Sequence, residues 1–167
     1  GLIIFDVDNL SVHGGSNRIY AKKPNIPSNN TVSGSVRDNL LEEKLFGLNE
    51  FETYLAFAQR VEKSKQSLVN LLQKIKVSGK KVMSIGATAK STTVFNYCNI
   101  GTDLIDVITD TTIDKQGKFS PGVHIPIMSR EDIDILDYDY VYLGAWNFKD
   151  VIANKEQEFV KNGGKFI

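Results

Sequence analysis

The octapeptide Gly86-Ala87-Thr88-Ala89-Lys90-Ser91-Thr92-Thr93 has the residue types that bind an anionic group. It joins an apolar run, expected to be a strand, to a segment with helical spacing. Free backbone N–H groups and the helix dipole favour an anion at such a helix amino terminus, and small side chains let a ligand approach. Lys90 adds a cation, and Ser91 and Thr92 add hydroxyl donors. The segment predicts a pyrophosphate site, with an ordinary helix cap as the alternative, because its spacing is neither G-x-G-x-x-G nor a P-loop.

Polar residues follow or lead into other apolar runs. Asp110 stands about 20 positions past the glycine turn, where dinucleotide-binding folds place the acidic residue that contacts a ribose hydroxyl; a loop-capping Asp is the alternative. Lys115 lies in the basic, turn-rich loop that follows, and that loop leads to His124, which is of interest only because the loop is expected to open at the ligand edge. Trp146 and Asn147 follow a later run, and Trp146 would line a sugar or base pocket unless it belongs to the core.

The amino-terminal part contains weaker candidates. Asp6-Val7-Asp8-Asn9 is similar to the D-x-D signature of haloacid-dehalogenase phosphatases, but Leu10 stands where the usual Thr would be, and strand–helix alternation begins only at residue 81. Both aspartates are more simply interpreted as the polar face of an edge strand. Cys98, the only cysteine, is interpreted as a buried structural thiol.

The elements that must position these residues follow from hydrophobic spacing. Residues 2–22 indicate two short strands around the Gly14-Gly15 pair, and 24–39, with two prolines and many Asn and Ser, indicate a linker or surface loop. Residues 48–77 have helical spacing and end at Ser78-Gly79. Strands and helices then alternate, which predicts an α/β fold with a Rossmann-like three-layer parallel sheet and ligands at the strands' carboxyl ends. The expected strands are 81–85, 104–109, 123–128, 138–145 and one beginning at 165; the expected helices are 91–98, a short acidic one after Ser129, and 148–162.

Composition excludes several classes of protein. With 20 basic and 20 acidic residues the net charge is zero, without the basic excess of a nucleic-acid binder. No apolar run approaches the ~18 residues of a membrane span, and the amino end lacks the pattern of a secretory signal. A single cysteine excludes an intrachain disulfide and a cysteine-cluster zinc site, and favours a reduced, cytoplasmic setting. Both ends lie inside β-like runs, so the chain is expected to be a piece of a larger enzyme.

Several motifs, in the same order along nearly the whole chain, resemble the carboxy-terminal domain of NDP-hexose C-methyltransferases, and most closely the deoxysugar 3-C-methyltransferases. A further stretch resembles the segment that closes the methyltransferase domain of that family. These motifs are Gly86-Ala87-Thr88-Ala89-Lys90-Ser91 through Asn96-Tyr97-Cys98, Asp114-Lys115-Gln116, Pro121-Gly122-Val123-His124-Ile125-Pro126, Trp146-Asn147, and Glu156-Gln157-Glu158-Phe159 before Gly163-Gly164-Lys165; the closing segment is His13-Gly14-Gly15-Ser16-x-Arg18.

The resemblance implies a three-part enzyme with a zinc-binding amino-terminal region, a central SAM-binding domain and a carboxy-terminal domain that holds a nucleotide-diphosphate sugar. In this chain it implies four segments: 1–23, the end of the SAM-binding domain; 24–47, a linker; 48–78, a connecting helix; and 79–167, the nucleotide-sugar-binding domain. His13, Ser16 and Arg18 would then lie at the interdomain cleft, unless the Gly-Gly pair is only a hairpin turn.

The chain departs from the complete family pattern. It has no SAM-type glycine loop, no zinc cysteines and no Tyr-x-Glu-His stretch with the presumed base. We therefore expect no catalytic residue and no metal ligand in this chain, and expect SAM and zinc to bind to missing domains of the same protein. The alternative function is a noncatalytic Rossmann-like module that binds a nucleotide or a partner protein.

Overall fold

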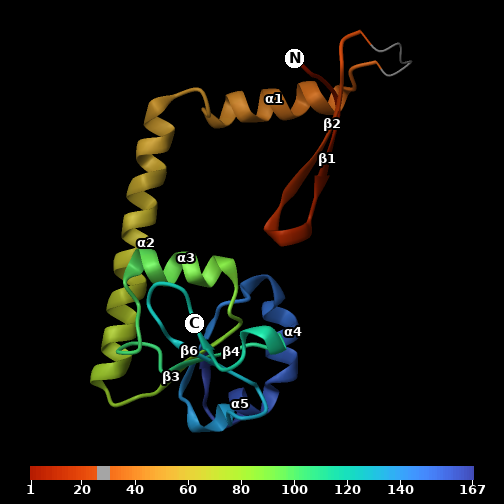
Figure 1. The fold of residues 1–167 in the computed structure, drawn as a ribbon. Helices are drawn as coiled ribbons and strands as arrows, with labels where there is room; N and C mark the ends of the chain where they lie inside the picture. Colours follow the sequence, from red (N-terminus) through yellow and green to blue (C-terminus); the bar gives the residue numbers. More distant parts are fainter. Residues whose placement is uncertain (26–30) are drawn as a thin grey trace. The chain divides into compact units, whose positions relative to one another are not determined.

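The structure is a computed structural model that describes residues 1–25 and 31–167. The chain divides into two compact units, Gly1–Arg60 and Val61–Ile167, with helix α2 (Phe51–Val77) contributing to both (Figure 1). The predicted domain limits at residues 23, 47 and 78 stay a prediction.

The first unit begins with the predicted strand pair. Strands β1 (Ile3–Leu10) and β2 (Ser16–Lys22) are antiparallel, with a bulge between Ile4 and Asp6. The turn between them has positive φ at His13, Gly14 and Gly15 (56°, 86° and 116°). Because glycine adopts this region at little cost, the Gly-Gly pair makes the reversal, as predicted.

Helix α1 (Gly34–Phe46) occupies much of the segment that was predicted to be a loop. Part of that loop, residues 26–30, lies outside the described residues. The loop prediction is wrong from residue 34 onward because Ser33 is a helix cap: its hydroxyl accepts a hydrogen bond from the Ser35 N–H at 3.0 Å. The Ser35 hydroxyl in turn donates to Asp6 at 2.7 Å, which fixes the start of the helix beside β1.

The second unit contains the predicted parallel sheet. Within the part of the chain that the structure describes, six strands lie in the order β5-β6-β4-β3-β7-β8, and all neighbours except β5 and β6 are parallel. The chain order of the parallel strands is third, second, first, fourth and fifth, so the winding reverses between β3 and β7. The strands are β3 (Val82–Ile85), β4 (Val107–Thr109), β5 (Lys118–Phe119), β6 (Pro126–Met128), β7 (Tyr140–Leu143) and β8 (Lys165–Phe166).

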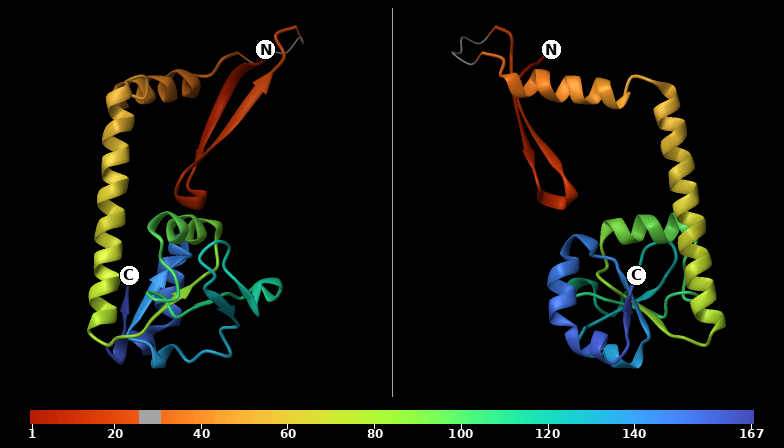
Figure 2. Two further views of the ribbon diagram at one scale, coloured as in Figure 1. Left: turned by 60° about the vertical axis from the view of Figure 1, so that its left-hand side comes forward. Right: turned by 180° about the vertical axis from the view of Figure 1, so that it is seen from behind.

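Helices cover both faces of this sheet, which confirms the three-layer prediction. On one face, Leu72 and Ile75 of α2 and Phe95 of α3 (Ala89–Cys98) pack in a core that includes Val82 and Ile108. On the other face, Phe159 of α5 (Gln157–Lys161) packs with the alternate strand residues Met83, Val107 and Val141. Figure 2 shows α2 and the two carboxy-terminal helices on opposite sides of the strands.

Two helix predictions in the second unit are wrong in detail. The expected helix 148–162 is broken at Glu156 into α4 (Lys149–Lys155) and α5, and the side chain of Glu156 pairs with Arg130. The expected acidic helix after Ser129 is instead a 3-10 turn at Ile135–Asp137, with the Asp134 side chain accepting from the Leu136 N–H.

Candidate functional site

The predicted anion-binding turn begins helix α3 with a complete capping box. The Thr88 hydroxyl accepts from the Ser91 N–H at 3.1 Å, and the Ser91 hydroxyl accepts from the Thr88 N–H at 3.0 Å. The Thr92 N–H donates to the Thr88 carbonyl at 3.0 Å. Three of the N–H groups that a phosphate would use are therefore already bonded within the turn. The alternative interpretation, an ordinary helix cap, is correct for these three groups.

Two other N–H groups of the same turn are also bonded: Gly86 donates to the Thr109 carbonyl at 2.7 Å and Ala87 to the Asp110 carboxylate at 2.8 Å. Two more have no partner among the described residues. The N–H groups of Ala89 and Lys90, in the first turn of α3, donate to no protein acceptor in residues 1–25 and 31–167. The site can therefore offer a ligand two backbone donors at the positive end of the helix dipole.

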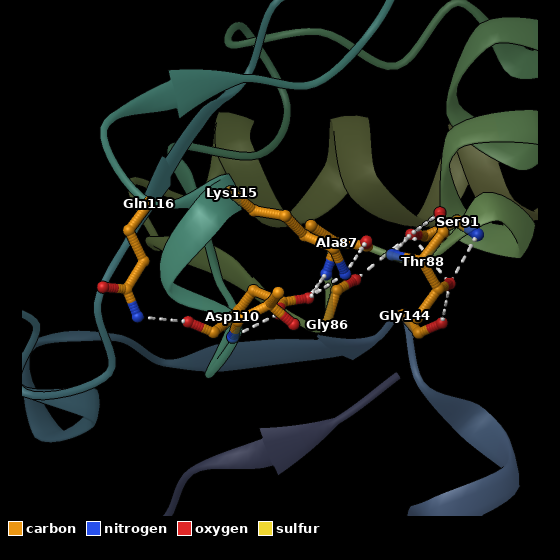
Figure 3. A network of polar contacts seen from close by, with 9 residues as sticks. Gly86, Ala87, Thr88, Ser91, Asp110, Lys115, Gln116 and Gly144 are labelled. Carbon is orange, nitrogen blue, oxygen red and sulfur yellow. Dashed lines mark hydrogen bonds and ion pairs between the residues drawn. The ribbon is translucent and has the colours of Figure 1, made fainter.

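Asp110 joins the turn after β3 to the loop after β4 (Figure 3). Its Oδ2 accepts from the Ala87 N–H at 2.8 Å and from the Lys115 ammonium at 3.1 Å, and its Oδ1 accepts from the Thr112 N–H at 2.8 Å. Lys115 also donates to the Ala87 carbonyl at 2.9 Å. A carboxylate has about four acceptor positions, so about one remains for the predicted ribose contact, which stays a prediction.

The same contacts set the charge state of Asp110. Burial raises the pKa of this carboxyl, but the hydrogen bonds from Thr112, Lys115 and Ala87 lower it by more, so the pKa lies below its ordinary value. Asp110 is therefore ionised at neutral pH, and its carboxylate links the turn after β3 to the loop after β4.

Three predicted ligand residues lie together beside the turn. The Lys90 ammonium donates to the Asn147 side-chain oxygen at 2.7 Å and lies 4.8 Å from the centre of the Trp146 ring. Trp146 is 49% exposed, so the alternative of a core tryptophan is wrong. A cation held over an aromatic ring keeps its position without losing its remaining donors.

A cavity of about 280 Å³ lies at the carboxyl edge of the sheet. It spans the point where the winding reverses between β3 and β7, which is where open α/β sheets bind ligands. The lining combines apolar side chains with polar and charged ones, and ligand pockets use such polar groups to orient what they bind. The lining residues are Ile85, Gly86, Thr88, Thr109, Asp110, Thr111, Arg130, Ala145, Phe148, Ile152, Lys155 and Glu156.

Nine of the twelve lining residues were not among the predicted site residues, and they include Arg130, Phe148, Ile152 and Glu156. Arg130 follows β6, so its place after a strand was a usable signal. Glu156 and Ile152 lie in a stretch with helical spacing, and nothing in that pattern indicates that the helix turns one face toward a cavity.

His124 lies away from this edge. It precedes β6, which is parallel to β4, so it stands at the amino end of that strand rather than the carboxyl end. The loop that leads to His124 reaches the ligand edge at Lys115, which contacts Ala87 and Asp110, but the expectation that His124 itself lies there is wrong. His124 is exposed, has φ 55° and donates its N–H to the Ser120 carbonyl at 3.1 Å.

The amino-terminal candidates belong to the first unit. The Ser16 hydroxyl donates to the Val12 carbonyl at 3.1 Å, and the Arg18 side chain, 59% exposed, lies 3.9 Å from Asp8. Asp8 also accepts from the Tyr20 hydroxyl at 2.8 Å. The role predicted for His13, Ser16 and Arg18 at an interdomain cleft stays a prediction.

Residues 1–25 and 31–167 contain no cluster of three or more His, Cys, Asp or Glu side chains that could hold a metal ion. Across those same ranges, no helix combines the length and the apolar character needed to cross a membrane.

Comparison with known proteins gives two matches. The family model for the C-methyltransferase C-terminal domain matches residues 11–167. C-methyltransferase NovU of Streptomyces niveus is 37% identical over 167 residues, which are 100% of this chain and 39% of NovU. The chain thus spans about two fifths of the length of the curated relative that it matches. Both matches are to the class of protein that the sequence motifs resemble.

Proposed function

Because this chain belongs to the C-methyltransferase C-terminal domain family, we propose that it is the nucleotide-sugar-binding part of a SAM-dependent sugar C-methyltransferase. The observation that carries the proposal is the position of the cavity. It lies at the reversal of strand order, and its lining includes Gly86 and Thr88 of the α3 turn and also Ala145 and Phe148, which flank Trp146 and Asn147 in the chain.

In the proposed binding mode, the diphosphate lies against the first turn of α3. The N–H groups of Ala89 and Lys90 and the Lys90 ammonium donate to its oxygens, and the Asn147 side chain keeps the ammonium in place at 2.7 Å. Charged hydrogen bonds of this type are stronger than neutral ones. The exposed ring of Trp146 then lies where it can pack against a sugar.

The proposed reaction assigns this chain a positioning role. SAM would supply the methyl group and leave as S-adenosylhomocysteine. A base in the missing part of the protein would remove the proton next to the sugar's keto group, and the carbon thus activated would take the methyl group. Holding the sugar in one orientation makes this attack effectively intramolecular. Zinc would belong to the missing amino-terminal region, and the buried free thiol of Cys98 supports a reducing, cytoplasmic setting.

The missing domains of the same polypeptide are the proposed partner of the first unit. A two-stranded hairpin is at best marginally stable by itself, and β1–β2 forms a separate two-stranded sheet among the described residues. Several large apolar side chains of this unit are also exposed, and exposed apolar patches mark contact surfaces. They include Ile19 at 57%, Leu41 at 55%, Leu45 at 79% and Phe46 at 65%.

A thermal-shift series tests the proposed function. We expect dTDP or UDP to raise the melting temperature, because a ligand that binds only the folded state stabilises it. We expect SAM to leave it unchanged, because the dinucleotide-type turn of the second unit is the one assigned to the sugar nucleotide. Stabilisation by SAM and not by nucleotides would reverse this assignment.

Replacing Lys90 with Ala is expected to weaken nucleoside-diphosphate binding by about 1–3 kcal/mol, the range for a hydrogen bond to a charged group. Titration calorimetry measures this directly. The exposed Lys161 on α5 offers a matched control, since Lys161→Ala removes the same charge at a distance from the turn. Equal affinities for the two variants, with both folded, contradict the phosphate site.

The second candidate function is a noncatalytic nucleotide- or protein-binding module. One observation favours it: the polar side chains of Asp110 and Lys115 are bonded to the protein itself. SAM binding by the complete gene product separates the two, because the noncatalytic module predicts none.

A further inference from the structure

We propose that Lys118 is a second phosphate-binding lysine, and that Asn96 is the positioning residue that keeps Lys118 in place. Lys118 belongs to the segment 115–122, which follows strand β4 and includes β5. Asn96 lies near the end of α3 and bonds this segment to the helix. The inference rests on the proposed function and deepens it, because it adds a cation and a positioning residue to the proposed diphosphate site.

The side-chain amide of Asn96 joins α3 to the segment 115–122. Its NH₂ group donates to the Thr92 carbonyl, in the preceding turn of the helix, at 2.8 Å and to the Pro121 carbonyl at 2.9 Å. Asn96 is exposed, so these contacts, rather than burial in the core, are what the side chain contributes. The bond to Pro121 therefore fixes one end of the segment on α3.

Gly122 lets the segment approach Asn96 closely. Its φ is 84°, a value that glycine adopts at little cost. A Cβ added at this position would meet the side-chain oxygen and carbon of Asn96. Both the backbone conformation and the available space therefore require glycine, and this end of the segment fits closely against the Asn96 amide.

Lys115 fixes the other end of the segment. Its ammonium donates to the Ala87 carbonyl and to the Asp110 carboxylate, as Figure 3 shows. The Gln116 side chain donates to the Asp110 carbonyl at 2.9 Å. The segment is thus held by the turn before α3 at one end and by the last part of α3 at the other.

A second cavity, of about 260 Å³, lies between α3 and the held segment. It is distinct from the cavity at the reversal of strand order, since only Thr88 lines both. Ala89 and Thr92 line it from the helix, and Lys118 and Phe119 line it from the segment. The N–H group of Ala89, one of the two proposed diphosphate donors, therefore belongs to a residue on the wall of this cavity.

Lys118 is the lysine of this cavity that can bind an anion. Its ammonium has no hydrogen-bond or ion-pair partner in the part of the chain that the structure describes, whereas the Lys115 ammonium is bonded within the protein. Asp114 also lines the cavity, but among the described residues no ion pair joins it to Lys118. An ammonium across the cavity from Ala89 can form a charge-assisted hydrogen bond with the same diphosphate.

A purely structural role for Asn96 is the competing explanation. In that case the amide stabilises the end of α3, and its loss lowers the melting temperature without any connection to Lys118. The two explanations differ in how the effects of Asn96 and Lys118 on ligand affinity combine.

Titration calorimetry with dTDP and with inorganic pyrophosphate tests the inference on the unmodified chain and on three variants. Lys118→Ala should weaken binding of both probes about tenfold, the effect of about one hydrogen bond. Asn96→Ala should weaken it about fivefold to tenfold, because the lysine is no longer held in place. The double variant should bind at most about twofold more weakly than Lys118→Ala, because effects of residues that act through each other do not add.

Asn162→Ala and Lys161→Ala are the matched controls. The Asn162 amide donates to the Glu158 carbonyl, four residues earlier, at 2.8 Å, as the Asn96 amide does within α3, but among the described residues it forms no bond to another segment. Lys161 is exposed on α5 and carries the same charge as Lys118. Both controls should leave the affinity for the two probes unchanged.

Unchanged affinity in both Lys118→Ala and Asn96→Ala, with the variants folded, overturns the inference and leaves the proposed function standing. Additive losses in the double variant also overturn it, because Asn96 then does not act through Lys118. If neither probe binds to the unmodified chain, the proposed function fails together with the inference.

If Asn96→Ala does not fold, hydrogen exchange on the unmodified chain decides the role of the segment. The N–H groups of Gly117 and Ser120 donate to the carbonyls of Ile127 and Ile125, at 2.8 Å each. Binding of dTDP should slow exchange at both positions about threefold or more, because a phosphate bound to Lys118 holds the segment in place. An unchanged exchange rate at saturating dTDP contradicts the phosphate contact.

Discussion

Replacing Asp110 with Asn is expected to lower the free energy of unfolding by about 2–4 kcal/mol, which is the largest single effect that the site predicts. The carboxylate accepts from Ala87, Thr112 and Lys115 and its side chain is 8% exposed. An amide keeps one acceptor oxygen but places an NH₂ group against an N–H or an ammonium. Denaturant unfolding measures the loss, and nucleotide affinity should fall with it because the 86–88 turn is no longer held. Asp114→Asn, an exposed position in the same loop, should change stability little.

The same substitution should change the dependence of stability on pH. The pKa of Asp110 is depressed in the folded chain, so its contribution is fully present above the unfolded pKa of about 4 and is lost as pH falls through the folded value. Unfolding curves of the unmodified chain between about pH 5 and pH 2 should therefore show a loss that Asp110→Asn lacks. If stability falls with pH equally in the two proteins, the Asp110 carboxylate does not stabilise the fold by linking the turn to the loop.

Replacing Gly144 with Ala is expected to cost about 3 kcal/mol of stability, at the upper end of the range for overpacking. A Cβ at Gly144 would meet the Gly86 carbonyl and lie 3.1 Å from the Ile85 carbonyl. Both obstacles are backbone, so neither can rotate away. The Gly144 carbonyl also accepts from the Thr88 hydroxyl at 2.8 Å, and any shift there disturbs the cap of α3.

Gly34→Ala is a matched control for Gly144→Ala. Gly34 is the first residue of α1, and the nearest atom to its added Cβ would be Asp38 Oδ2 at 3.9 Å. Alanine favours a helix over glycine, so this change should leave stability unchanged or raise it. If both alanine variants melt at the same temperature, the close approach of the two strand ends at Gly86 and Gly144 does not constrain the turn.

The fold followed from the sequence because its signals are local and repeated. Apolar runs bounded by glycine located β3 and β7, and the spacing of Leu68, Leu72 and Ile75 located α2. Elements fixed by one distant contact were not predictable in this way. The break at Glu156 coincides with a contact to Arg130, which is 26 positions away. Likewise α1 depends on the Ser33 cap and its contact with β1, in a segment whose Asn, Ser and Pro content is typical of a loop.

The candidate site was predictable in its backbone and less so in its side chains. Strand ends in a parallel sheet meet at one edge whatever the sequence between them, so Lys90, Trp146 and Asn147 were placed together. His124 was misplaced because its strand begins at residue 126, and the last residues before a parallel strand lie at the opposite edge of the sheet. Asp110 accepts a hydrogen bond from Lys115 of its own loop. The spacing of residues in the sequence does not predict this side-chain contact.

The strand order also has a kinetic consequence. The central strand β3 pairs with β4, which follows soon after it, and with β7, which follows only after β4 and β6. Contacts between residues far apart in sequence require the closure of a longer loop and form more slowly. The pairing of β3 with β7 is therefore expected to form late in folding. Gly86 and Gly144 directly follow the two strands. Stopped-flow refolding with a fluorescent nucleotide should show binding appearing with the slowest structural phase, so that ligand capture reports completed folding.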